Sequence, residues 1–186
     1  LVNMNVGVLA LQGDFREHLA SLAECGVSAT AVKTPEEISA ISALVIPGGE
    51  STTISKLAKS FGLFDLIANR IKDGMPTYGS CAGMIMVAKS IKDPASGQET
   101  FGGIDMAVER NAFGRQVDSF EEDLDFKGIS GPKFRSVFIR APWVTSLGKG
   151  VEEGKQAPVN SQVSKGLTRS RADKLGVVSS GSVDAR

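Results

Sequence analysis

Short apolar runs alternate with segments of helical periodicity through the first half of this chain. Residues 6–11, 29–33 and Ala43–Ile46 are apolar runs that end at turn residues, as strands buried on both faces do. Helical spacing follows them at residues 15–22, from Pro35 onward, and at residues 54–71; Asp14 and Glu17 form a capping-box pair before the first of these helices. Strands joined by helical crossovers lie parallel, so the alternation predicts an α/β fold with a parallel sheet.

The pattern changes after the middle of the chain. An extended segment at residues 75–78 and a helix at residues 82–91 continue the alternation, but residues 104–109, 116–126 and 136–139 are strands separated by Gly and Pro. We expect these strands to form an antiparallel extension of the sheet, within one domain covering residues 1–150. Residues 151–186 contain no Phe, Trp or Tyr and are rich in Ser, Gly, Lys and Arg, which predicts a poorly packing tail with a minor strand at Val177 and Val178.

Composition excludes several classes of protein. The 186 residues are 41% hydrophobic and 23% charged, which is typical of a globular domain. Lys and Arg total 21 against 21 for Asp and Glu, so no net positive charge favours nucleic acid. No apolar run approaches the roughly 20 residues of a membrane helix, and residues 1–5 lack the basic segment of a secretion signal, so we do not expect secretion. Two cysteines fit a reducing compartment, so we expect a cytoplasmic protein. We expect neither a metal nor a cofactor.

The run Gly79-Ser80-Cys81-Ala82-Gly83 lies between a predicted strand and a predicted helix. This G-x-C-x-G arrangement is that of a nucleophile elbow, a sharp strand-to-helix turn that presents a reactive side chain. A thiol at a helix N-terminus is favoured as thiolate, and the backbone N–H of Ala82 faces a developing oxyanion. The alternative is a buried, inert cysteine, which is the better interpretation for Cys25.

A second Gly-rich turn, Pro47-Gly-Gly-Glu-Ser-Thr-Thr53, also joins a strand to a helix. Its N–H groups are candidates to cradle an anion or to supply a second oxyanion donor, at Gly49, while Ser51 or Thr52 caps the helix. Capping alone is the simpler interpretation, and the spacing is not that of a Walker loop. Because ligands bind at the carboxyl ends of parallel strands, this turn, the loop at Gln12 and Gly13, and the Cys81 turn are expected to converge on one crevice.

A cysteine nucleophile normally needs a base, and the chain has one histidine, His18. Its place in the first helix predicts a surface or packing residue, because that helix is expected to lie against a face of the sheet and not over the strand ends. Arg110 and Arg140 are either clamps for a carboxylate or solvated surface residues. Trp143 is most simply a packing residue.

At these motifs the chain resembles class I glutamine amidotransferases, and more narrowly the glutaminase subunits of pyridoxal 5′-phosphate synthase. The resemblance implies a three-layer, flavodoxin-like domain and extends from Asn5 to about Val151. The segments that carry it are Gly7-Val-Leu-Ala-Leu-Gln-Gly13, Pro47-Gly-Gly-Glu-Ser-Thr-Thr53, Gly79-Ser-Cys-Ala-Gly83, Val108-Glu-Arg-Asn-Ala-Phe-Gly-Arg-Gln-Val-Asp-Ser-Phe120 and Val137-Phe-Ile-Arg-Ala-Pro142.

The resemblance implies that Cys81 attacks the side-chain amide of L-glutamine, forms a glutamyl thioester and releases ammonia for vitamin B6 synthesis. It implies an interface with a barrel-shaped synthase subunit at Gln12. The substrate-binding residues that it implies are Gly49, Glu50, Ser51, Arg110, Ile139 and Arg140.

One departure is large. The family ends in a Phe-His-Pro-Glu segment that supplies the His and Glu of a catalytic triad, and nothing in residues 151–186 matches it. We therefore expect the tail to differ from the family's C-terminus and turnover by these 186 residues to be very slow. The alternatives are a catalytically inactive binding subunit of the same complex and a flavodoxin-like anion-binding module.

Overall fold

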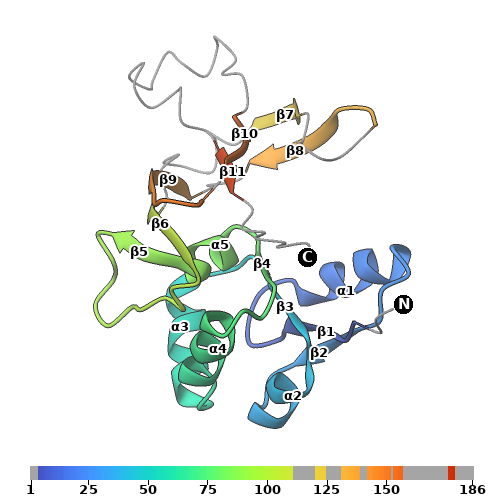
Figure 1. The fold of residues 1–186 in the computed structure, drawn as a ribbon, viewed down its shortest axis with the longest axis vertical. Helices are drawn as coiled ribbons and strands as arrows, with labels where there is room; N and C mark the ends of the chain where they lie inside the picture. Colours follow the sequence, from blue (N-terminus) through green and yellow to red (C-terminus); the bar gives the residue numbers. More distant parts are fainter. Residues whose placement is uncertain are drawn as a thin grey trace. The chain divides into compact units, whose positions relative to one another are not determined.

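The computed structural model describes residues 4–110, 120–124, 131–138, 142–151, 153–156 and 176–178. The chain divides into two compact units, residues 1–104 and 105–186 (Figure 1). The domain boundary predicted near residue 150 stays a prediction, because most of the residues beyond it lie outside the described ranges. None of the helices in the described ranges has the length and apolarity that a bilayer crossing requires.

The first unit is built on a four-stranded parallel sheet. Its strands are β1 (Val6–Leu9), β2 (Ala29–Val32), β3 (Ala43–Ile46) and β4 (Thr77–Gly79), in the order β2-β1-β3-β4. Strand β1 pairs with β2 from Val6 opposite Ala29, and with β3 from Val6 opposite Ala43. Strand β4 pairs with β3. The predicted α/β class and parallel sheet are confirmed.

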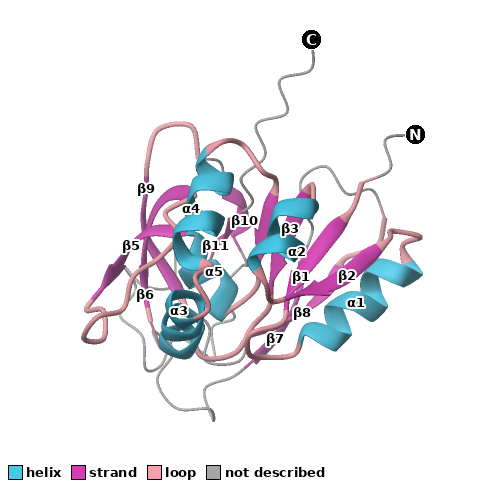
Figure 2. Ribbon diagram, turned by 90° about the horizontal axis from the view of Figure 1, so that it is seen from below, coloured by secondary structure: helices cyan, strands magenta, loops and turns pink. Residues whose placement is uncertain are grey.

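Four helices connect these strands, and a fifth follows β4: α1 (Phe15–Glu24), α2 (Pro35–Ala40), α3 (Ser51–Ser60), α4 (Phe64–Lys72) and α5 (Ala82–Val87). The chain moves one way across the sheet from β1 to β2 and the opposite way from β2 to β3. Right-handed crossovers therefore put α1 and α2 on opposite faces. Figure 2 shows α1 on one side of the sheet and α2 and α4 on the other, which is the expected three-layer arrangement.

Both faces of the sheet are apolar. Successive strand residues point to opposite sides, and one side, formed by Val6, Val8, Ala43 and Val45, packs against Phe15, Leu19 and Leu22 of α1. Residues of the other side are as deeply buried, with Leu44 at 1% and Ile46 at 0% exposure. Burying one such side chain stabilises a fold by about 1.5–3 kcal/mol.

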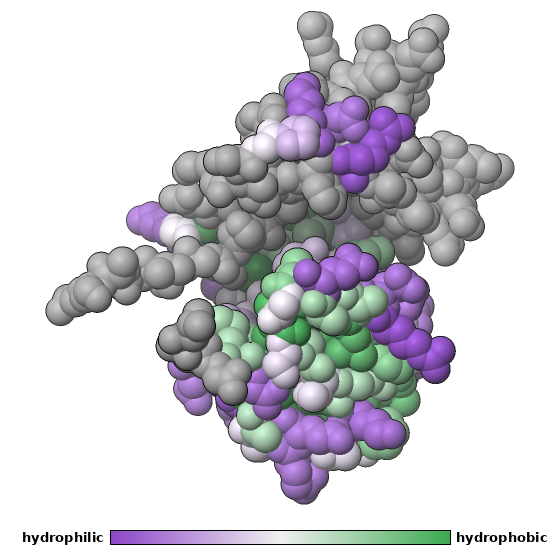
Figure 3. All heavy atoms as spheres, turned by 90° about the vertical axis from the view of Figure 1, so that its right-hand side faces the viewer, coloured by the Kyte–Doolittle hydropathy of each residue, from purple (hydrophilic) through white to green (hydrophobic). Residues whose placement is uncertain are grey.

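Helix α1 is only partly covered, since none of its residues is fully buried. Figure 3 views the molecule from the side on which α1 lies in Figure 1, and shows apolar residues gathered in the middle of the lower part with hydrophilic residues around them. The capping box predicted for this helix is wrong: Asp14 is the N-cap residue, but its side chain makes no capping hydrogen bond. A capping box is present on α2, between Thr34 and Glu37.

The helix predicted at residues 82–91 is shorter than expected, with 6 residues. Helix α5 ends at Val87, and strand β5 (Ala88–Lys92) follows directly. In β5 the only fully buried residue is Ala88, so the segment lacks the apolar face that would hold a longer helix against the sheet.

The later strands pair antiparallel, as expected, but in the described residues they form sheets separate from the four-stranded one and not an extension of it. Strand β6 (Ile104–Glu109) pairs with β9 (Trp143–Leu147), β7 (Phe120–Leu124) with β8 (Phe134–Phe138), and β10 (Glu153–Gln156) with β11 (Gly176–Val178). Strands β9 and β10 were not predicted; β11 is the minor strand expected at Val177 and Val178. Trp143 is 7% exposed, which confirms its packing role.

Candidate active site

Cys81 lies at a strained strand-to-helix turn. Strand β4 ends at Gly79, α5 begins at Ala82, and Cys81 between them has φ 49° and ψ −107°. Among the described non-glycine residues, only Asp93 shares a positive φ. Such a conformation costs about 1–3 kcal/mol and clusters at functional sites. The thiol is exposed. The predicted elbow geometry is confirmed, whereas the nucleophilic role of Cys81 stays a prediction.

The glycines around Cys81 are required by close backbone approach. A Cβ atom on Gly83 would overlap the carbonyl oxygen of Ile46, and one on Gly79 would overlap that of Gly83. Two hydrogen bonds fix Ser80, the residue before Cys81: Ser80 N donates to Ile46 O at 3.1 Å, and Gly83 N donates to Ser80 O at 2.7 Å. A side chain at Gly83 would therefore separate the elbow from the end of β3, and one at Gly79 would push the start of α5 away from the end of β4.

The three loops expected to converge do so. A Cβ atom on Gly13 would overlap the carbonyl oxygen of Gly48, and a Cβ atom on Gly48 would lie 3.5 Å from Cβ of Cys81. The side chain of Gln12 crosses between two loops, since its Oε1 accepts a hydrogen bond from the N–H of Glu50 at 2.8 Å. Gly49 has φ 141°, and a Cβ there would overlap the Gln12 amide. Gly48 is the residue of this turn that the structure places beside Cys81.

Glu50 caps α3, although Ser51 or Thr52 was expected to do so. Its carboxylate accepts hydrogen bonds from Thr53 N at 2.8 Å, from Thr53 Oγ1 and from Thr52 Oγ1. Partial burial raises the pKa of Glu50, but the hydrogen bonds from Thr52 and Thr53 outweigh it, so that the pKa falls below its ordinary value of 4.5. The carboxylate of Glu50 therefore stays ionised to a lower pH than that of an ordinary glutamate.

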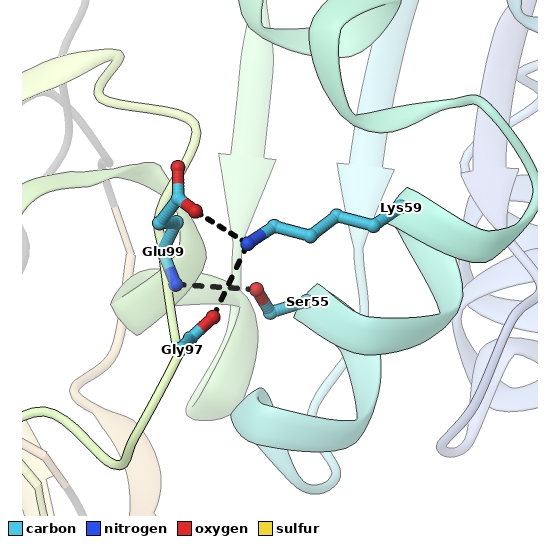
Figure 4. A network of polar contacts seen from close by, with 4 residues as sticks. All are labelled: Ser55, Lys59, Gly97 and Glu99. Carbon is cyan, nitrogen blue, oxygen red and sulfur yellow. Dashed lines mark hydrogen bonds and ion pairs between the residues drawn. The ribbon is translucent and has the colours of Figure 1, made fainter.

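Ser51 points into the protein. It is 2% exposed, and its Oγ accepts a hydrogen bond from Nε2 of Gln98, which is 9% exposed, at 2.9 Å. One turn further along α3, Ser55 Oγ accepts from the N–H of Glu99. Lys59, a further turn along, pairs with the Glu99 carboxylate and donates to Gly97 O (Figure 4). The hydroxyl of Ser51 therefore helps to fasten the loop after β5 to α3; its predicted contact with substrate is not tested.

His18 lies beside the elbow, which contradicts the sequence-based expectation that it is remote from the strand ends. Its Nε2 is 3.1 Å from Oγ of Ser80, the residue before Cys81. Its ring also meets Tyr78 of β4 edge-on, with 6.3 Å between ring centroids. The expectation failed because the Gln12–Gly13 loop holds the start of α1 against the Gly48 turn, so the first turns of the helix reach the carboxyl edge of the sheet.

The remaining predicted site residues are placed only in part. Ala82 directly follows Cys81, begins α5 and is 2% exposed; its role as an oxyanion donor stays a prediction. Arg110 directly follows β6 in the second unit and is half-buried. Ile139 and Arg140 lie outside the described residues. Within the described ranges, no group of three or more His, Cys, Asp or Glu side chains is arranged to hold a metal ion.

Comparison with known proteins places this geometry in a family. The family model described as the SNO glutamine amidotransferase family matches residues 8–164. The match continues past Val151, where the sequence resemblance was expected to end, and leaves residues 165–186 outside.

Two curated relatives are named pyridoxal 5′-phosphate synthase subunit PdxT. The one from Streptomyces coelicolor is 60% identical over 147 residues, which are 79% of this chain and 73% of the relative. The one from Rhodococcus jostii is 54% identical over 161 residues, 87% of this chain and 80% of the relative. A solved structure described as a glutamine amidotransferase shares 49% identity and a TM-score of 0.74, covering 81% of this chain and 79% of its own. The chain belongs to the SNO glutamine amidotransferase family.

Proposed function

We propose that this chain is a glutaminase subunit, which hydrolyses L-glutamine to glutamate and ammonia for pyridoxal 5′-phosphate synthesis by a partner subunit. The Cys81 thiolate attacks the side-chain amide carbon, and the tetrahedral intermediate collapses to a glutamyl thioester as ammonia leaves with an added proton. Water then cleaves the thioester, which frees glutamate and restores the thiol. The names of the two PdxT relatives support this assignment.

The observation that carries the proposal is the strained elbow at Cys81. A cysteine with φ 49° whose thiol is exposed, rather than packed, is poorly explained by a structural role. In the proposed reaction the N–H of Ala82, at the start of α5, donates to the oxyanion, and the Gly48–Gly49 turn beside Cys81 supplies the second donor. Preorganised donors of this kind stabilise a tetrahedral oxyanion by about 2.7–4 kcal/mol each.

We propose that the Gly-rich turn and the two arginine segments hold the glutamine. Gly49, Glu50 and Ser51 contribute from the turn, where the ionised Glu50 carboxylate attracts the substrate's ammonium group. Arg110 is the candidate partner for its carboxylate, because a guanidinium binds a carboxylate through two parallel hydrogen bonds. Ile139 and Arg140 complete the proposed set.

The partner in this proposal is the barrel-shaped synthase subunit, which receives ammonia along a protected path. Gln12 is proposed to lie at that interface. Its amide oxygen accepts a hydrogen bond from Glu50 N, so a partner that moved the Gln12 side chain would also move the Gly-rich turn. We also propose a cytoplasmic location, which the two free cysteines support.

The test is release of ammonia from glutamine by the full chain, with and without the synthase partner. We expect slow release that the Cys81→Ala variant lacks and that Cys25→Ala, the matched control, retains. General acid–base help supplies about 10²–10⁴-fold per step, and the chain has a single imidazole, so the rate is expected to be low. Binding to the synthase without any turnover above Cys81→Ala would favour the inactive-subunit alternative. Absence of both would favour an anion-binding module.

A further inference from the structure

His18 and Ser80 are 62 residues apart in sequence and joined by a hydrogen bond of 3.1 Å between Nε2 and Oγ. Both side chains are half-buried. The ring of His18 lies edge-on to Tyr78 at an interplanar angle of 67°, in the arrangement that aromatic pairs prefer. The hydrogen bond to Ser80 and the ring contact with Tyr78 thus hold the His18 ring against the carboxyl end of β4. No step of the proposed reaction uses His18.

A strained elbow persists only where its surroundings hold it. The backbone of Ser80 is bonded at both ends, to Ile46 O through its N–H and to Gly83 N through its carbonyl. Its hydroxyl is the remaining polar group, and His18 bonds it. Three atoms of Ser80 are therefore held, its N by β3, its carbonyl oxygen by α5 and its Oγ by α1. Ser80 directly precedes Cys81, the residue with φ 49°.

We propose that His18 is a positioning residue for the Cys81 elbow and acts through Ser80. Release of the Ser80 hydroxyl lets Cys81 relax toward an ordinary φ value, which turns the thiol away from the position in which the elbow presents it. The inference deepens the proposed function, because it assigns the one imidazole of the chain to holding the nucleophile in place rather than to accepting its proton.

Alkylation of the two cysteines by iodoacetamide tests this without any need for glutaminase activity. Cys25 is an internal control, since it is also exposed and is the C-cap residue of α1, the helix that carries His18. We expect His18→Ala and Ser80→Ala each to lower the Cys81 rate about two- to ten-fold relative to Cys25, which is the scale of one hydrogen bond. The double variant should lose no more than either single variant.

The conservative variant separates positioning from a merely structural role. His18→Gln places an amide group near the former Nε2, so it should restore most of the Cys81 rate. The idea is overturned if the Cys81 rate is unchanged in Ser80→Ala, if His18→Gln is as slow as His18→Ala, or if Cys25 changes in parallel with Cys81. Loss of glutamine turnover in the unmodified protein, with this alkylation pattern intact, would count against the proposed function alone.

Discussion

Replacement of Cys81 by glycine should make the protein more stable than replacement by alanine. Alanine keeps the Cβ atom and hence the strain of φ 49°, whereas glycine adopts this conformation freely. The strain is worth about 1–3 kcal/mol. Against this, glycine makes the unfolded chain more flexible, which costs about 0.4–1 kcal/mol. The difference leaves Cys81→Gly more stable than Cys81→Ala by between 0 and about 2.6 kcal/mol, or about 1.3 kcal/mol at the middle of both ranges.

Cys25 provides the control for the same pair of substitutions. It has φ −78°, an ordinary value, so Cys25→Gly should be less stable than Cys25→Ala by about 0.4–1 kcal/mol. Denaturant unfolding followed by the helical circular dichroism signal measures both differences, because the helices in the described ranges all belong to the first unit. If glycine destabilises at both positions by similar amounts, the elbow stores no strain and the argument for Cys81 from backbone geometry fails.

Four further predictions concern other residues. Ser51→Ala should lower the free energy of unfolding by about 1–3 kcal/mol, because it removes a buried partner of Gln98. Lys59→Met removes an exposed ion pair and should lower the free energy of unfolding by less than about 1 kcal/mol. Denaturant titration of both variants checks that Ser51→Ala is the more destabilising of the two. Arg110→Ala should weaken glutamine binding by about 1.5–3 kcal/mol with the fold intact, and unchanged affinity in calorimetry would remove it from the site. The lowered pKa of Glu50 means that its ionised form stabilises the fold above pH 4.5 and that this contribution is lost as pH falls through the lower folded pKa. The stability difference between the native chain and Glu50→Gln should therefore shrink below pH 4.5, and a difference that grows on acidification would contradict the sign.

The parallel sheet and the meeting of three loops could be predicted from the sequence because each rests on a local pattern. An apolar run of four residues and a following glycine turn specify a buried strand and its carboxyl end without knowledge of the rest of the chain. The short α5 could not be predicted in this way. Residues 82–91 have no proline or glycine after Gly83, and only tertiary contacts decide that the helix ends at Val87.

The position of His18 shows where local patterns stop being sufficient. Spacing placed it correctly on the first helix, but the reach of that helix along the sheet is decided by the loop before it. The Gln12 side chain accepts a hydrogen bond from Glu50 N, and Gly13 lies against the Gly48 carbonyl. The helix that follows Gly13 therefore starts beside the Gly-rich turn. His18 comes three residues after Phe15, the first residue of α1, and its Nε2 is therefore still within hydrogen-bond distance of Ser80 Oγ. The same glycine contacts that bring the loops together therefore bring the only imidazole of the chain to the nucleophile's neighbour, and a side chain at Gly13 should disturb both at once.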